Sequence, residues 1–132
     1  MTAFGRSLAL AVTLMGTTLI VSCGCNDSLE QWPLWKAYSS SFINKDGRVV
    51  EPSAQDRTTS EAQAYAMFHA LVVGDREQFD RILAWTQKNL AKGDLKTNLP
   101  SWNWGQDSEG TWRVLDENSA SDADLWMTYA LL

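Results

Sequence analysis

Carboxylate side chains at two places in the sequence could carry out acid–base chemistry or bind a polar ligand. Glu61 lies in the segment 58–67, just before a run of apolar residues at helical spacing. Asp122 and Asp124 lie in the segment 119–124, where a second helical pattern begins. General acid–base catalysis needs positioned groups of this kind that can give or take a proton. The starts of these two predicted helices are therefore candidate parts of a reactive site.

The role of Glu61 depends on where its helix begins, and two capping patterns overlap there. If Thr58 is the N-cap, Glu61 three residues later is the reciprocal capping residue and has a structural role. If Ser60 is the N-cap, Gln63 takes that role and Glu61 is free to point elsewhere. The local pattern alone favours the structural role.

Four stretches, in the same order along the chain, resemble glycoside hydrolase family 8. The similarity is greatest to the endo-β-1,4-glucanases of bacterial cellulose-synthesis operons. The stretches are Trp32-Pro33 with Trp35 and Phe42, then Thr58-Thr59-Ser60-Glu61 with Gln63, Tyr65 and Met67, then Leu99-Pro100-Ser101-Trp102-Asn103-Trp104-Gly105, and Ser119-Ala120-Ser121-Asp122-Ala123-Asp124. The resemblance therefore covers the chain from about Trp32 to its last residue.

The resemblance implies the chemistry of an enzyme that cleaves a β-1,4-glucan such as cellulose with inversion. Such a reaction uses one carboxylic acid and one carboxylate about 6.5–9.5 Å apart. In this family Glu61 corresponds to the general acid, and Asp122, Asp124 and Tyr65 correspond to substrate-binding positions. The family's catalytic base is an aspartate of its C-terminal half, to which no residue here can be assigned. We therefore expect this chain alone to be inactive.

For Glu61 to act as a general acid its carboxyl group must be protonated, and its position at a helix start opposes this. A helix N-terminus favours the ionised carboxylate by roughly 0.3–1 kcal/mol. Burial, or a second carboxylate nearby, favours the protonated form and can outweigh that effect. Asp122 is the natural candidate for the second carboxylate, although acidic residues at a helix start are also common without any function.

Tryptophan is unusually frequent, with seven in 132 residues. Trp102 and Trp104 flank a single residue, so in an extended segment both rings would lie on one side. They could stack on sugar rings as substrate-binding residues, or fill the core, and the sequence does not separate these roles. Trp85 and Trp126 fall on helical patterns and are predicted core residues.

The rest of the sequence predicts an all-α fold of helical hairpins. Apolar residues at helical spacing follow Pro33, then Glu61, then Asp75, which also starts an N-cap pattern. The segment 95–118 is predicted to be irregular, and a last helix begins near Ser121. By resemblance, residues 32–132 are the N-terminal part of an (α/α)6 barrel, about a third of the whole. The chain is thus expected to be a truncated form of that barrel.

The first residues carry an export pattern. Arg6 precedes an apolar run from Leu8 to Val21, which is typical of a secretory signal peptide at residues 1–22. The following Cys23 fits a bacterial lipoprotein box, in which the cysteine carries lipid; ordinary cleavage near Cys25 is the alternative. Residues 23–31 form a polar linker. We expect a periplasmic protein or one anchored to the envelope by lipid.

Composition narrows the class of partner. The net charge is −5, which argues against nucleic-acid binding and is compatible with a neutral sugar polymer. No cofactor is implied, and the single His69 has no nearby His or Cys with which to hold a metal. We expect a monomer. Two alternatives stay open: a non-catalytic glucan-binding remnant, or a xylanase or chitosanase of the same family.

Overall fold

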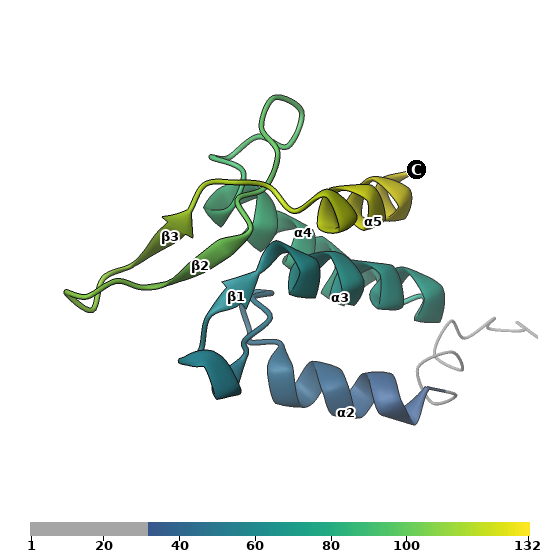
Figure 1. Ribbon diagram of the computed structural model, residues 1–132. Coiled ribbons are helices and arrows are strands. Elements are labelled where there is room, and N and C mark those ends of the chain that lie inside the picture. Colours follow the sequence, from purple (N-terminus) through teal and green to yellow (C-terminus); the bar gives the residue numbers. More distant parts are fainter. Residues whose placement is uncertain (1–31) are drawn as a thin grey trace, which may run out of the picture.

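The computed structural model describes residues 32–132, and Figure 1 shows their arrangement. The predicted signal peptide, Cys23 and the linker lie outside the described residues. The elements follow the order α2 (Pro33–Phe42), the 3-10 turn η1 (Pro52–Ala54), β1 (Thr58–Thr59), α3 (Ser60–Val73), α4 (Arg76–Asn89), β2 (Asn103–Gln106), β3 (Trp112–Asp116) and α5 (Ser121–Leu131). The predicted helices are therefore all present.

Helices α3 and α4 form the predicted antiparallel hairpin, and their short connection has a well-defined structure. Gly74 ends α3 in the left-handed conformation, and its N–H bonds back to the carbonyls of the last turn. Asp75 then caps α4 by accepting a hydrogen bond from the Gln78 N–H at 3.1 Å, as its sequence pattern predicts. One glycine and one aspartate are thus enough to reverse the chain.

Asp75 also attaches α2 to this hairpin. Its second oxygen accepts a hydrogen bond from the indole Nε1 of Trp35 at 3.0 Å. Trp35 is the one residue of α2 that is fully buried. Since both carboxylate oxygens of Asp75 bind protein groups, this residue is occupied by structural contacts.

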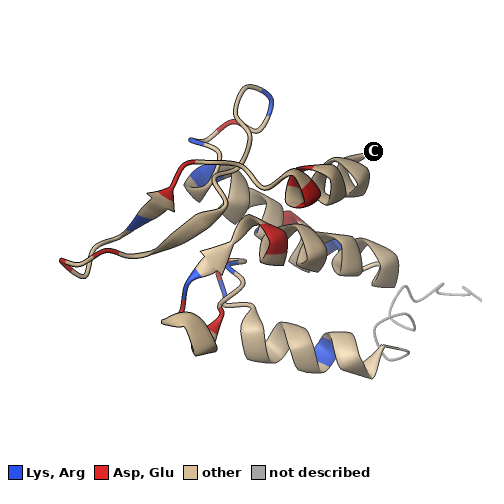
Figure 2. Ribbon diagram, in the orientation of Figure 1, with Lys and Arg blue, Asp and Glu red and all other residues tan. Residues whose placement is uncertain are grey.

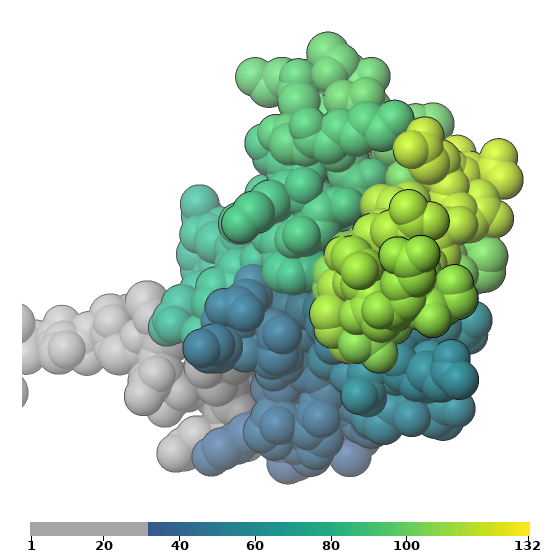
Figure 3. Space-filling model, turned by 90° about the vertical axis from the view of Figure 1, so that its left-hand side faces the viewer, coloured from purple at the N-terminus to yellow at the C-terminus, as the bar shows by residue number. Residues whose placement is uncertain are grey.

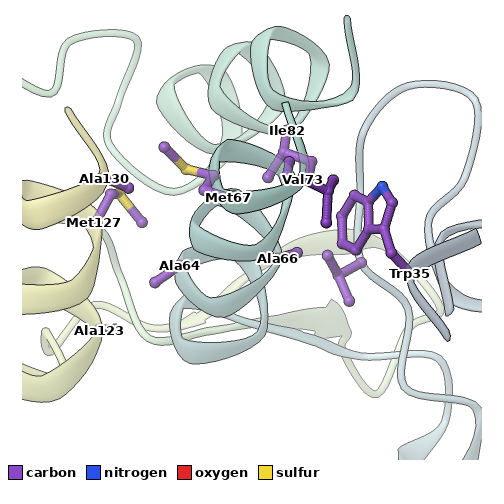
Figure 4. Packing of buried hydrophobic residues seen from close by; sticks show 11 residues of the cluster. Trp35, Ala64, Ala66, Met67, Val73, Ile82, Ala123, Met127 and Ala130 are labelled. Carbon is purple, nitrogen blue, oxygen red and sulfur yellow. The ribbon is translucent and has the colours of Figure 1, made fainter. Parts of the chain in front are cut away.

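Helix α3 lies at the centre of the core. Figure 4 shows it between α5 on one side and Trp35 on the other. Several of its buried residues are alanines, which allow neighbouring elements to approach closely. The buried apolar cluster comprises Trp35, Val49, Ala64, Ala66, Met67, Ala70, Val73, Ile82, Ala123, Met127 and Ala130. Because α3 is covered on several sides, it is apolar around most of its circumference.

The loop between α2 and β1 packs tightly on α4 at Gly47. This glycine is buried and has φ +91°, a conformation that favours glycine. A Cβ placed there would overlap the backbone carbonyl of Arg81 in α4. The side chain of Asn44 shapes the same loop by accepting hydrogen bonds from the N–H groups of Asp46 and Arg48. The position of the loop is therefore set by backbone contact.

The prediction that 95–118 is irregular is wrong for its second half, which forms a β-hairpin. Strands β2 and β3 pair antiparallel, and β1 pairs with β2 to complete a three-stranded sheet of order β1-β2-β3. Between the strands the Asp107 carboxylate accepts hydrogen bonds from the N–H groups of Glu109 and Thr111. Gly110 follows at φ +80°. The turn residues thus specify a hairpin that the short strands alone do not signal.

Apolar side chains remain exposed on the outer faces of α3 and α5. Trp126, expected in the core, is 39 % exposed within the described part. Leu71, Val72, Leu125 and Tyr129 are more exposed than Trp126. Within the described part, the buried residues of α5 are Ala123, Met127 and Ala130, and its other residues are partly or largely exposed. Among residues 32–132 no helix is both long and apolar enough to cross a membrane.

Candidate active site

Glu61 lies in the first turn of α3, but neither predicted capping pattern is correct. The N-cap is Thr59, whose side chain accepts a hydrogen bond from the Ala62 N–H at 3.2 Å. The Thr58 hydroxyl instead donates to the carbonyl of Val49 at 2.6 Å. Glu61 therefore sits at the second helical position and is not the reciprocal capping residue.

The Glu61 carboxylate is partly buried and has one hydrogen-bond donor among the described side chains. The Ser60 hydroxyl donates to its Oε2 at 3.1 Å. Ser60 itself is fully buried. With no backbone N–H bound to it, the carboxylate is available for chemistry.

Gln63 is not a cap either; it is a buried connection between three segments. Its Oε1 accepts a hydrogen bond from the Val49 N–H at 2.6 Å. Its Nε2 donates to the Thr86 hydroxyl of α4 at 2.8 Å and lies 3.3 Å from the Gly47 carbonyl. Gln63 therefore fixes α3 against α4 and the preceding loop. Sequence reasoning missed this role because the three partners are distant along the chain.

Asp122 lies close to the start of α3, as expected. Figure 2 shows acidic positions in red at the starts of α3 and α5, which are adjacent. The hydroxyl of Tyr65 donates a hydrogen bond to Asp122 Oδ2 at 2.9 Å. This bond, together with burial and the charges of Asp122 and Glu61, raises the pKa of Tyr65 above its ordinary value. The structure therefore brings these three predicted residues together.

The backbone of Trp102 helps to bring the two helix starts together. Its carbonyl accepts a hydrogen bond from the Ser60 N–H at 3.0 Å, next to Glu61. Its N–H donates to the carbonyl of Asn118 at 2.7 Å, shortly before α5. Through these two backbone hydrogen bonds, Trp102 positions Glu61 relative to the first turn of α5.

Asp124 has a different environment from Asp122. Its Oδ1 is buried and has no hydrogen-bond partner among the described residues. Burial raises the pKa of Asp124, the Ser119 hydroxyl opposes this, and the charge of Asp122 adds to it. The two predicted substrate-binding aspartates are therefore not equivalent, and only Asp122 is joined to Tyr65.

The rings of Trp102 and Trp104 have different surroundings. A β-bulge between Asn103 and Trp104 interrupts the alternation on which that expectation depends. Trp104 stacks on Trp112 at 4.9 Å between ring centroids and meets the edge of Trp85 at 5.2 Å. Trp102 makes no ring contact with this cluster in the described part. Trp104 is thus chiefly a packing residue of the hairpin.

Sequence reasoning missed two members of that cluster, Arg48 and Trp112. The Arg48 guanidinium lies over both stacked rings, at 4.9 Å from the centroid of Trp104 and 4.7 Å from that of Trp112. Burial lowers the pKa of Arg48. Figure 3 shows the hairpin, in yellow-green, beside the blue segment that leads from α2 to β1. The nearly symmetric placement of Trp104 and Trp112 about the Asp107–Gly110 turn was the signal available.

His69 lies on α3 away from any cluster of metal ligands. Its Nδ1 is 2.7 Å from the Tyr65 carbonyl, and its ring meets the edge of Phe68. Among residues 32–132 no group of three or more His, Cys, Asp or Glu could hold a metal ion.

Comparison with known proteins places this geometry in a family. Residues 9–132 match the family described as Glycosyl hydrolases family 8. The chain is 53% identical over 117 residues to an endoglucanase of Escherichia coli (strain K12), which covers 88% of this chain and 32% of that protein. It is 47% identical over 131 residues to an endoglucanase of Xanthomonas axonopodis pv. citri, covering 96% and 34%. The chain thus spans about a third of the length of these curated relatives.

Solved structures give the same result. The endo-1,4-D-glucanase from Vibrio fischeri ES114 is 46% identical, with a TM-score of 0.74 over 76% of this chain and 29% of that one. The endo-beta-1,4-glucanase CMCax from Acetobacter xylinum is 29% identical, with a TM-score of 0.65 over 80% and 31%. The described helices are therefore part of an (α/α)6 barrel, as predicted, and the chain belongs to glycosyl hydrolase family 8.

Proposed function

We propose that this chain is the N-terminal third of the catalytic domain of an inverting endo-β-1,4-glucanase that acts on cellulose. The observation that carries the proposal is the convergence of Glu61, Tyr65 and Asp122 at the adjacent starts of α3 and α5. The relatives named endoglucanases support the reaction class. The family-8 xylanase of similar fold is only 17% identical, which supports the fold alone.

In this proposal Glu61 is the general acid. Its protonated carboxyl gives a proton to the oxygen of the leaving sugar while water attacks the anomeric carbon from the opposite side. Asp122 binds a hydroxyl of the sugar next to the scissile bond. The base that takes the proton from water belongs to the two thirds of the family barrel that this chain does not match. The residues of this chain thus supply the acid and part of the binding surface.

A chimeric enzyme tests the proposal. Residues 32–132 replace the corresponding third of the Escherichia coli endoglucanase, which supplies the remaining two thirds of the barrel. We expect hydrolysis of a soluble cellulose derivative, and proton NMR of cellohexaose cleavage should show the α-anomer first, because inversion of a β-bond gives that product. A folded chimera that binds cellohexaose without cleaving it would support the glucan-binding remnant instead.

We also propose that the natural protein is exported and carries lipid on Cys23. The support is the sequence alone: Arg6, the apolar run and the lipoprotein-type pattern before Cys23. Mass spectrometry of the mature N-terminus after expression in a bacterial host tests it. A mature chain that begins at Cys25, or an uncleaved Met1, would contradict lipid attachment.

A further inference from the structure

We propose that Tyr65 acts as a positioning residue for Asp122 and does not itself bind the sugar. The inference rests on the proposed function, because it assigns Asp122 to the sugar. It replaces the expectation that Tyr65 is a substrate contact in its own right.

The contact between the two side chains is held from both helices. Tyr65 lies four residues after Glu61, on the same face of α3. Its ring meets the edge of the Trp126 ring at 6.1 Å and 74° between planes, and Trp126 lies four residues after Asp122 on α5. The phenol is therefore fixed by packing against the helix that carries its acceptor.

Tyr65 provides the only hydrogen bond to the Asp122 side chain among residues 32–132. The hydroxyl donates to Oδ2 at 2.9 Å, so the other oxygen, Oδ1, is left to accept from a ligand. Asp122 is otherwise exposed on the first turn of α5. Without the phenol, nothing in the described part holds the carboxylate in one orientation.

The chemistry of the phenol suits this role. Its raised pKa keeps the hydroxyl protonated, so it remains a donor. A carboxylate has two acceptor oxygens, so one that accepts a hydrogen bond from the protein can accept a second from a sugar hydroxyl. Because the single proton of the phenol is donated to Asp122, the hydroxyl has none left to donate to a sugar. The geometry thus favours a phenol that orients the carboxylate.

A double-mutant cycle in the chimera tests the proposal. Tyr65→Phe keeps the ring on Trp126 and removes only the hydroxyl; we expect kcat/KM for cellohexaose to fall about 10- to 100-fold, the range of a hydrogen bond to a charged group. In an Asp122→Ala background the same change should cost less than about twofold, because no carboxylate is left to orient. Equal losses in both backgrounds, or no loss in the first, would overturn the positioning role.

Two further measurements separate this inference from its alternatives. Tyr129→Phe removes a hydroxyl from the same aromatic group, where it has no hydrogen-bond partner in the described part, and should leave kcat/KM unchanged. The dissociation constant for cellohexaose is also measured for each variant of the double-mutant cycle, because this measurement requires no turnover. A chimera that binds but does not hydrolyse would refute the proposed reaction alone, whereas one that binds no cellohexaose would overturn the role of Tyr65 as well.

Discussion

Helices α3 and α4 begin with the same layout but use it differently. Each has a polar N-cap, Thr59 or Asp75, and a glutamate at its second helical position, Glu61 or Glu77. The Glu77 side chain is 82% exposed and pairs with Arg81 one turn along its own helix. Glu61 is partly buried and lies beside α5. The same local position thus gives a solvated ion pair in one helix and a reactive candidate in the other.

The N-caps of the two helices differ in which side chain satisfies the backbone N–H groups. In α4 the carboxylate of Asp75 is fully occupied by the Gln78 N–H and the Trp35 indole. In α3 a hydroxyl performs the capping, so the nearby carboxylate keeps its acceptor capacity. A carboxylate at a helix start is therefore a better candidate for chemistry when another group already satisfies the backbone N–H groups.

The largest expected effect separates the two glutamates. In the chimera, Glu61→Gln keeps the shape of the side chain but removes the transferable proton, so kcat should fall by about 10²–10⁴-fold. Glu77→Gln is the matched control and should leave kcat near that of the parent. Reducing-end release is the measurement. Wild-type rates in a folded Glu61→Gln enzyme would mean that the acid lies elsewhere.

The second prediction tests how fully Asp75 is occupied. Asp75→Ala removes a cap and leaves the Trp35 indole without its acceptor, so the free energy of unfolding should fall by about 2–3 kcal/mol. Asp75→Asn, which can still cap α4, should lose less. Urea unfolding of the 132-residue chain, followed by far-UV circular dichroism, measures both. Equal losses would show that the cap is not the larger contribution.

A smaller effect is expected at the other cap. Thr59→Ala removes one side-chain acceptor and should lower the free energy of unfolding by about 1 kcal/mol, while Thr59→Ser should be nearly neutral. The same urea experiment applies. If Thr59→Ala left the free energy of unfolding unchanged, the assignment of the N-cap would be wrong.

The smallest effect concerns the buried oxygen of Asp124. Its folded pKa is raised, so the group favours folding below its unfolded pKa and loses that contribution as pH rises through the folded value. Asp124→Asn should therefore raise Tm slightly at neutral pH, with a difference that disappears in acid. Thermal unfolding between pH 3 and about pH 7 checks this. A lower Tm for the variant at neutral pH would contradict the sign.

Local sequence determined most of the helical framework. Pro33, Asp75 and the Gly74 end of α3 act through their own backbone neighbours, so their patterns predict α2 and the α3–α4 hairpin correctly. The four ordered motifs also predicted the family and the positions of Glu61, Tyr65 and Asp122. Such features are readable because each depends on residues close together in the chain or on a pattern of residue types.

Tertiary pairing decided the rest. Thr58 and Thr59 pair with Trp104 and Asn103, which holds the chain extended up to Thr59 and moves the helix start to Ser60. This pairing joins segments about 45 residues apart in the chain. It made both capping predictions wrong and left Glu61 free. The stacking of Trp104 on Trp112 and the burial of Gln63 likewise depend on partners that only the folded chain brings within reach. Capping energies of about 1 kcal/mol are small enough for such pairing to override them.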